Sequence, residues 1–475
     1  MNTSTHYTPS IRLTLSLLAT ILGLPVWASD YTGDWQVAAQ IEARIQAPEF
    51  PDRDFPITDF GALGDGQTDN TKAIRTAIRV CHEAGGGRVI VPEGSFLTGP
   101  VHLMSNVNLH LVEGSVLLFS REPSDYLPQV LTRWEGVECM NYSPLIYAHG
   151  QRNIAVTGKG TLDGQAGLEY WWPWKGKTEY GWKEGKPNQL DGRNRLFAMG
   201  QEGLPVAERV FGDGDYLRPS FLQPYSCENV LIEGVTIIRS PMWEIHPVLS
   251  RNVTVRGVTV ISHGPNNDGC NPESCKDVLI EDCIFDTGDD CIAIKSGRNN
   301  DGRRVAVPSE NIIVRGCLMR DGHGGVVIGS EISGGCRNVF VEDCRMDSPN
   351  LDRAIRIKTN SVRGGLIENI HVRNVTIGQV AESVFKVNFL YEEGDGHGFT
   401  PIVRNVIFEN VTSQQSRFPM YIIGYEHSPV RNVRFINCRF EGVEEPSVIR
   451  HVENLVLDRV IIGKEKSMDT WGRMQ

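Results

Sequence analysis

A repeat of alternating apolar residues dominates the second half of the chain. From about residue 225 onward, a turn residue, usually Asn, precedes a short stretch in which apolar and polar side chains alternate, as in NVLIEGVTI and NVTVRGVTV. Strict alternation predicts β-strands, and turn residues that recur 22 to 36 positions apart predict a solenoid rather than a sandwich. The recurring turn residues are Asn229, Asn252, Asp277, Asn311, Asn338, Asn369, Asn405, Asn432 and Asn454.

The fold predicted from this repeat is all-β, a single-stranded right-handed parallel β-helix. Leucine-rich repeats have a similar period, but their leucine spacing is missing and no helical pattern alternates with the strands. The shortest spacings give the minimal coil, and the longer ones predict loops inserted between strands. Earlier coils are expected in RVIVPEG (88–94), VNLHLVEG (107–114) and NIAVTGKGTLDG (153–164).

Two segments depart from the repeat. Ile74, Ala77, Ile78 and Cys81 follow helical spacing, which predicts a short amphipathic helix that caps the open first coil. Residues 165–222 interrupt the repeat and contain YWWPWKGKTEYGWKEGKPN. The aromatic side chains and lysines of this insertion either contact sugar rings and uronates or form a self-packed loop that covers the coil.

The chain has 11 cysteines, and most of them occupy fixed positions of the repeat. In stacked coils such positions form columns of small apolar side chains, so buried free thiols are the simplest expectation. One disulfide between adjacent coils is also geometrically possible. The cysteines six residues after a turn residue or two residues before one are Cys283, Cys317, Cys344, Cys438, Cys227, Cys275 and Cys336.

The first 28 residues are typical of a secretory signal peptide. Arg12 precedes the apolar run LTLSLLATILGLPVWA, which ends in small residues at Ala28. The run is shorter than the ~20 residues of a membrane-spanning helix, which argues against an anchor. We therefore expect an exported protein, periplasmic or secreted, whose folded part covers residues 29–475.

The formal net charge is −11, which disfavours nucleic acid and anionic membranes as partners. No later segment of the sequence is long and apolar enough for stable membrane insertion. An acidic polymer could bind only through a local basic pocket. The sequence leaves the oligomeric state open.

Alignment of the coils gathers chemically active side chains on one face. The strands CIAIKS (291–296), GVVIGS (325–330) and AIRIKT (354–359) superpose, which places Asp289 and His323 in the same register. Asp268 precedes Asp289 by 21 residues, about one minimal coil, so we expect it on the preceding coil. Asp290 adjoins this pair in sequence.

Cations are expected beside these carboxylates. Arg356 and Lys358 alternate with isoleucines, so both point outward if the isoleucines point into the core, and Lys295 occupies the row of Lys358. Carboxylates so close together cannot all ionise freely, which predicts a protonated acid beside an ionised base. Each residue alone has an ordinary explanation as a turn residue or a solvated charge, and only their convergence indicates a site.

Four short motifs at these positions resemble those of glycoside hydrolase family 28, the polygalacturonases, and most closely its exo-acting bacterial members. They are Asn266-Asn267-Asp268, Asp289-Asp290, Gly322-His323-Gly324 and Arg356-Ile357-Lys358, in the family's order. Each motif is weakly specific alone. The four in order within a pectin-lyase-like β-helix are strongly specific, and the resemblance extends to DFGALGDGQTDN at 59–70.

The resemblance implies inverting hydrolysis of α-1,4-linked galacturonate in pectic polysaccharide or oligogalacturonide. It implies that Asp289 is the general acid, that Asp268 and Asp290 activate water, and that His323 orients or tunes the acid. Arg356 and Lys358, with Asn266 and Lys295, are the expected substrate-binding residues. No metal ion and no organic cofactor is implied.

The insert SGRNNDGRRVAVPSEN between Asp290 and His323, together with residues 165–222, is expected to close one end of the groove, which favours exo action. Endo action and hydrolysis of rhamnogalacturonan remain alternatives. A calcium-dependent pectate lyase would use the same aspartates as calcium ligands. A non-catalytic carbohydrate-binding β-helix is the last alternative.

Overall fold

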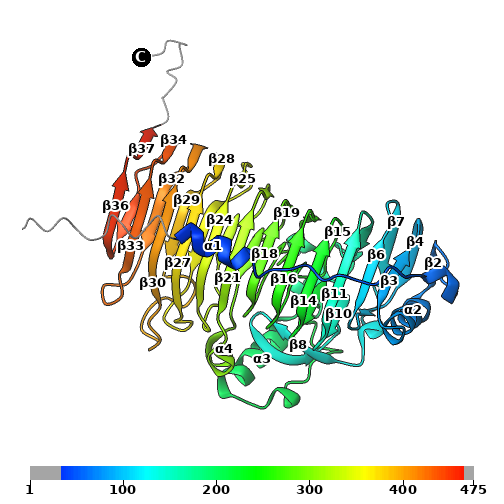
Figure 1. Cartoon of the computed structure of the whole chain (residues 1–475). Helices are drawn as coiled ribbons and strands as arrows, with labels where there is room; N and C mark the ends of the chain where they lie inside the picture. Colours follow the sequence, from blue (N-terminus) through cyan, green and yellow to red (C-terminus); the bar gives the residue numbers. More distant parts are fainter. Residues whose placement is uncertain (1–33, 465–475) are drawn as a thin grey trace, which may run out of the picture.

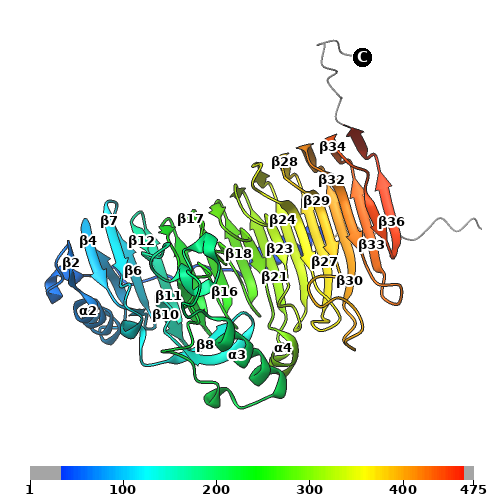
Figure 2. The same cartoon turned by 180° about the vertical axis from the view of Figure 1, so that it is seen from behind.

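Successive coils of the chain place their strands on three parallel faces (Figure 1). The computed structural model describes residues 34–464, and the predicted signal segment 1–28 lies outside these residues. The strands of one sheet come from successive coils, which confirms the predicted single-stranded, right-handed parallel β-helix. Figure 2 shows the same stack from behind.

The first face is a sheet of 13 strands that contains the recurring turn residues. All nine turn residues adopt a left-handed conformation, with φ between 53° and 60°, which Asn and Asp tolerate better than other side chains. Their side chains also bond to one another along the stack; for example, Asn338 Nδ2 donates to Asn311 Oδ1 at 3.0 Å. The strands are β1 (Asp54–Pro56), β3 (Gly87–Val91), β6 (Val107–Leu111), β11 (Arg152–Gly158), β14 (Glu228–Glu233), β16 (Arg251–Arg256), β18 (Lys276–Glu281), β21 (Ser309–Arg315), β24 (Cys336–Glu342), β27 (Leu366–Arg373), β30 (Ile402–Glu409), β33 (Val430–Ile436) and β36 (Val452–Asp458).

The second face is also a sheet of 13 strands. Its strands are β2 (Asp65–Asp69), β4 (Gly94–Thr98), β7 (Ser115–Phe119), β12 (Thr161–Asp163), β15 (Thr236–Ile238), β17 (Thr259–Ser262), β19 (Ile284–Thr287), β22 (Leu318–Met319), β25 (Arg345–Met346), β28 (Thr376–Gln379), β31 (Thr412–Gln415), β34 (Arg439–Val443) and β37 (Ile461–Lys464).

The third face carries the predicted site residues, and it consists of a three-stranded and a six-stranded sheet. Single bridges from Leu222 through Ile245 and Cys270 to Ile292 connect the two sheets into one surface. The first sheet comprises β5 (Val101–His102), β10 (Ile146–His149) and β13 (Leu222–Tyr225). The second comprises β20 (Ile292–Ile294), β23 (Val326–Ile328), β26 (Arg353–Lys358), β29 (Ser383–Asn388), β32 (Phe418–Ile423) and β35 (Val448–Arg450).

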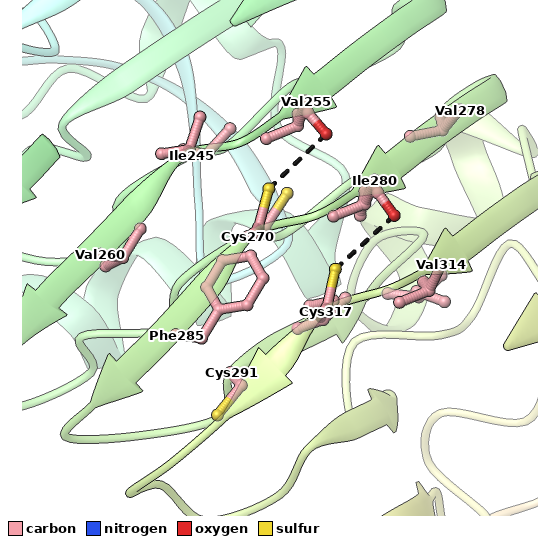
Figure 3. Close-up of a cluster of buried hydrophobic side chains, with 14 of the residues drawn as sticks. Ile245, Val255, Val260, Cys270, Val278, Ile280, Phe285, Cys291, Val314 and Cys317 are labelled. Atoms are coloured by element: carbon pink, nitrogen blue, oxygen red, sulfur yellow. Dashed lines mark hydrogen bonds between the residues drawn. The ribbon is translucent and has the colours of Figure 1, made fainter. Parts of the chain in front are cut away.

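The core runs along the axis of the stack and contains aliphatic side chains, phenylalanines and thiols. All 11 cysteines are free and buried, which confirms the expectation of free thiols and leaves no disulfide. Figure 3 shows Cys270, Cys291 and Cys317 among valine, isoleucine and phenylalanine side chains. The thiol of Cys317 donates to the carbonyl oxygen of Ile280 on the neighbouring coil at 3.7 Å. In these columns a thiol therefore acts as a small apolar group that also satisfies a backbone carbonyl.

Two helices lie at the start of the chain. α2 (Thr71–Glu83) buries Ala73, Ile74, Ala77, Ile78 and Cys81, and it covers the first coil as predicted (Figure 1). α1 (Asp34–Glu42) packs against the outer side of the first face near β18 and β21, and the sequence did not predict it. α1 lacks a strong amphipathic repeat, so its helical signal is weak.

Two excursions leave the stack on the side of the third face. Residues 165–222 contain α3 (Leu190–Glu202) and no strand of the three faces before β13, and the sequence identified this segment as an interruption. The second excursion is an antiparallel hairpin of β8 (Val130–Trp134) and β9 (Val137–Asn141), which the sequence did not predict. Figure 2 shows β8, α3 and the short α4 (Asn299–Val305) together at the same edge of the stack.

Within residues 34–464, no helix combines the length and the apolar character needed to cross a lipid bilayer.

Candidate active site

Three aspartates meet on the outer side of the third face, where the coils of β17, β20 and β23 adjoin. Pairing of Cys270 with Ile292 aligns Asp268 with Asp290. The sequence spacing had predicted alignment of Asp268 with Asp289, one position earlier. Asp289 precedes Asp290 in the turn between β19 and β20. One carboxylate oxygen from each of the three lies within 4.8 Å of those of the other two. The coil register therefore brings together the three aspartates that the sequence predicted to be neighbours.

His323 stacks on Asp289 as predicted. The register of β20 with β23 pairs Ile292 with Val326, so the residues three positions earlier on each coil are neighbours as well. The backbone N–H of His323 donates to the carbonyl oxygen of Asp289 at 3.0 Å, and its Nδ1 lies 3.1 Å from Asp289 Oδ1. The imidazole is half exposed and faces the cleft above the carboxylates.

Two of the predicted cations are bound to the aspartates. Lys358 Nζ donates to Asp290 Oδ2 at 2.7 Å, and the ammonium of Lys295 lies 3.5 Å from Asp268 Oδ2. Lys295 also donates to Glu331 at 3.2 Å, and only 3% of its side chain is exposed. These lysines thus neutralise carboxylates within the protein.

Arg356 is more available to a ligand than Lys295 and Lys358 are. Its nearest carboxylate oxygen is Asp290 Oδ1 at 4.0 Å, and 12% of its side chain is exposed to the cleft. β26 places Arg356 beside Val327 and Lys386 on the outer side, while Ile355 and Ile357 point into the core as the sequence predicts.

Asn266, the first residue of its motif, lies beside the insertion. Its side-chain oxygen accepts hydrogen bonds from Lys175 Nζ at 2.8 Å and from Arg218 Nη2 at 2.9 Å. Two cations therefore converge on one neutral amide.

The electrostatics of the three aspartates follow from burial and from their neighbours. Burial and the charge of Asp289 raise the pKa of Asp268 well above its usual range. Burial also opposes ionisation of Asp289, but the hydrogen bond and charge of His323 prevail and hold the pKa of Asp289 well below its usual range. The same hydrogen bond raises the pKa of His323 to about 9. The pKa values of the two carboxyls are thus shifted in opposite directions, which favours the protonated form of Asp268 and the ionised form of Asp289.

The aspartates lie at the bottom of a cleft of about 400 Å³. One wall is the tip of the β8–β9 hairpin, where Arg298 N donates to Gly136 O at 2.9 Å. Gly136 has φ 84°, and a Cβ there would lie 2.8 Å from Arg298 N, so only glycine fits this approach. α3 supports the same wall, because the guanidinium groups of Arg193 and Arg298 both lie over the ring of Phe197.

Most residues of this wall were not found from the sequence. Arg298 Nη1 donates to Glu331 Oε1 at 3.1 Å, and Arg193 Nε donates to Glu135 Oε2 at 3.0 Å. These residues lie in loops outside the repeat, so no register argument places them. The further lining residues missed from the sequence are Trp243, Ser330, Asp352, Arg353, Tyr391 and Glu392.

The aromatic side chains of the insertion pack against the coil rather than line the cleft. Trp171 is buried against Tyr126, and Trp172 Nε1 donates to the carbonyl oxygen of Ser240 at 2.9 Å. Among the lysines of this segment, Lys175 lines the cleft, whereas Lys177 and Lys183 are exposed. For the tryptophans, the self-packed alternative is correct.

The three aspartates offer the donor atoms of a cation site, but their surroundings do not fit calcium. Calcium takes six to eight oxygen ligands. Here ammonium groups lie 2.7 Å from Asp290 and 3.5 Å from Asp268, where they supply positive charge and occupy the space that a calcium ion would need. The donor set therefore disfavours the calcium-dependent lyase alternative.

Comparison with known proteins assigns the family. The profile of Glycosyl hydrolases family 28 matches residues 212–457. The chain belongs to this family. A second profile, Rhamnogalacturonase A/epimerase, pectate lyase-like, matches residues 55–111. Family membership confirms the resemblance found in the sequence and makes the protein a glycoside hydrolase.

Individual relatives agree with this assignment. The chain is 30% identical over 397 residues to a probable polygalacturonase of Vitis vinifera, covering 80% of this chain and 73% of the relative. It is 28% identical over 424 residues to an exo-poly-alpha-D-galacturonosidase of Dickeya chrysanthemi, covering 82% and 68%. The crystal structure of a hyperthermoactive exopolygalacturonase from Thermotoga maritima is 48% identical, with a TM-score of 0.88 over 90% of this chain and 96% of that one.

Proposed function

We propose that this family 28 enzyme hydrolyses α-1,4-galacturonosyl linkages in pectin-derived galacturonides and releases single units from the non-reducing chain end. The observation that carries the proposal is the wall beside the aspartates, where the β8–β9 tip, α3 and the loop before α4 meet. The exo-acting relatives at 48% and 28% identity support the same mode of action.

Excursions of the chain bound the cleft. On the side of the N-terminal coils, which we call the closed side, Lys175 of the insertion lies beside Asn266 and Arg193 of α3 lies beside Glu135. On the side of the C-terminal coils, which we call the open side, the outward row from Arg356 continues through Lys386 to Tyr421, and the ring of Tyr391, from the loop after β29, lies 5.5 Å from the Arg356 guanidinium. The insertion on the closed side ends the groove there, which favours exo over endo action.

The proposed roles follow the family resemblance. Asp289 donates a proton to the leaving oxygen, while Asp268 and Asp290 activate the attacking water, and His323 orients Asp289. Arg356 binds a galacturonate carboxylate. Lys358, Lys295 and Asn266 contribute less directly, because each is already bound to a protein group.

The position of the proton refines these roles. In the free site, burial and the charge of Asp289 favour the protonated form of Asp268, whereas the hydrogen bond to His323 favours the ionised form of Asp289. Coupled carboxyl groups share protons as a set. Asp289 can thus act as the acid if binding of the anionic substrate draws the proton from Asp268 to Asp289, a transfer between neighbouring oxygens.

Inversion is part of the proposal and rests on the family resemblance. The nearest oxygens of the three aspartates lie within 4.8 Å of one another. Inverting enzymes usually hold their two carboxyl groups about 6.5–9.5 Å apart, and retaining enzymes about 5 Å apart. Spacing alone would favour retention, so the stereochemistry needs its own test. Proton NMR of the first-formed product decides it: β-galacturonate from the α-linkage supports inversion, and α-galacturonate contradicts it.

A product time course on polygalacturonate tests the mode of action. Monomer alone from the earliest time supports exo action, and mixed oligomers indicate endo action. A label on the reducing end should stay on the shortened chain if units leave from the non-reducing end. Activity on rhamnogalacturonan with none on polygalacturonate would contradict the substrate assignment. Unsaturated products that depend on calcium would indicate a lyase.

We further propose that residues 1–28 direct export and that residues 29–475 form the mature β-helix enzyme. The basic and apolar pattern ending at Ala28 supports this proposal. Sequencing the N-terminus of the processed protein tests it: a start at Ser29 agrees, and retention of Met1 in the exported fraction contradicts it. Fractionation of periplasm and medium separates the two destinations.

A further inference from the structure

Among the cations on the cleft, Lys175 lacks the close carboxylate partner that most of the others have. Lys295, Lys358 and Arg298 each lie within 3.5 Å of a carboxylate oxygen. Arg193 is bound to Glu135 in the same way. Lys175, by contrast, has no carboxylate oxygen within 4.0 Å among residues 34–464.

The only side-chain acceptor of Lys175 in the described chain is the amide oxygen of Asn266, at 2.8 Å. Arg218 lies behind this amide and is fully buried. Its guanidinium donates to the same oxygen at 2.9 Å and to the carbonyl oxygens of Pro241 and Pro265. No carboxylate of the described residues pairs with Arg218 either. Two positive charges therefore share neutral acceptors at one edge of the cleft.

Such an arrangement is costly unless an anion completes it. A buried charge without a counter-charge is unfavourable. Proteins usually pair such a group with an opposite charge, or the group changes its protonation state and becomes neutral. Burial lowers the pKa of Lys175 and lowers that of Arg218 to about 10, which is the direction expected for cations short of negative charge. The more distant charges of Glu135 and Asp289 offset only part of this effect.

The chain holds Lys175 at the cleft through structure of its own. Lys175 ends a short 3-10 helix, Trp172–Lys175, which is followed by Gly176 at φ 79°. Trp171 and Trp174 anchor this helix through their edge-to-face contact. The ammonium is therefore fixed beside Asn266 on the closed side of the aspartates, whereas Arg356 lies on the open side.

We propose that Lys175, supported through Asn266 by the buried charge of Arg218, binds the carboxylate of the terminal galacturonate at the closed end of the cleft. Arg356 then binds the carboxylate of the following unit. The insertion thus contributes a second uronate-binding position that makes the enzyme selective for a charged terminal unit. This inference rests on the proposed exo-acting hydrolysis of galacturonides.

The test compares two trigalacturonates that differ only at the non-reducing end. One carries the natural carboxylate, and in the other that carboxylate is reduced to the primary alcohol. Wild type, Lys175→Gln and Lys175→Arg are assayed for kcat/KM on both. The matched control is Lys183→Gln, because Lys183 lies in the same insertion but is exposed and outside the cleft. Thermal unfolding midpoints verify that the variants are folded.

A charge-assisted hydrogen bond predicts that wild type prefers the charged substrate by roughly 10- to 100-fold in kcat/KM. Lys175→Gln should lose a similar factor on the charged substrate, keep its activity on the neutral one, and so lose the preference. Lys175→Arg should recover part of it, and Lys183→Gln should behave as wild type.

An unchanged preference in Lys175→Gln, or a wild type without preference, overturns the inference while the hydrolase assignment stands. A wild type that cleaves neither substrate overturns the proposed function and the inference with it.

Discussion

The ion pair between Lys358 and Asp290 offers a quantitative test of how the stack accommodates its charges. Lys358 Nζ lies 2.7 Å from Asp290 Oδ2, and the side chains are 9% and 1% exposed. Asp290 Oδ1 has no hydrogen-bond partner among the described residues, so Lys358 is the main group that neutralises this carboxylate. Lys358→Met keeps the length of the side chain and removes the charge.

Removing one partner of a buried ion pair costs about 3–5 kcal/mol, because the remaining charge is left unpaired. In Lys358→Met the buried carboxylate of Asp290 loses the counter-charge that lies 2.7 Å away, so the protonated form becomes the less costly one to bury. A carboxyl whose folded pKa is raised loses stability as pH rises from the unfolded toward the folded pKa. The deficit relative to wild type should therefore be large at pH ~7 and small at pH ~4.

The assay is equilibrium urea unfolding at both pH values. Lys276→Met is the matched control, because Lys276 lies 2.9 Å from Glu310 but is 55% exposed, and such a pair contributes at most about 1 kcal/mol. Adding Asp290→Asn to Lys358→Met should restore most of the stability, since the unpaired charge is gone. A deficit no larger than that of Lys276→Met, or no recovery in the double variant, would refute the reasoning.

Four further outcomes are expected. Asp289→Asn should lower kcat by at least about 10²-fold, with oligogalacturonide affinity and unfolding midpoint near wild type; kcat close to wild type would contradict its role as the acid. The pairing of His323 with Asp289 is complete below pH ~6.5 and is lost as pH rises through about 9, so kcat/KM should fall there in wild type. His323→Gln should lack that alkaline decline, and a persisting decline assigns it to another group. Arg356→Gln should raise KM for trigalacturonate by roughly 10- to 100-fold, and an unchanged KM would contradict uronate binding. Dithiothreitol should leave the unfolding midpoint unchanged, because every cysteine is a free thiol; a lower midpoint would reveal a disulfide.

The repeat made most of the fold predictable. Alternation and the recurring turn residues give the strands and their stacking, and the stacking gives the register. Register in turn brings Asp289 and His323 together, although they are 34 residues apart. The period of the repeat thus predicts the coil on which a residue lies and its register there, for any residue that belongs to the repeat.

The walls of the cleft could not be placed in this way. Gly136 meets Arg298 through an excursion of the chain that has no period, and the contact joins coils far apart in sequence. Neither the hairpin β8–β9 nor the direction in which Lys175 points follows from a local pattern. The sequence could not decide whether the tryptophans beside Lys175 contact sugar rings or pack against the coil. Aromatic residues that anchor a loop and those that bind sugars have the same sequence pattern.

The balance of charge explains how an acidic protein can bind an acidic polymer. Asp289, Asp290 and Glu331 are the negative groups of the inner site once Asp268 holds its proton. His323 pairs with Asp289 and Lys358 with Asp290, while Lys295 and Arg298 share Glu331. Arg356 on the open side and Lys175 on the closed side have no carboxylate oxygen nearer than 4.0 Å, so positive charge is in excess around the aspartates. Galacturonates on either side of the scissile bond supply the two missing negative charges, so a neutral sugar would leave both cations uncompensated.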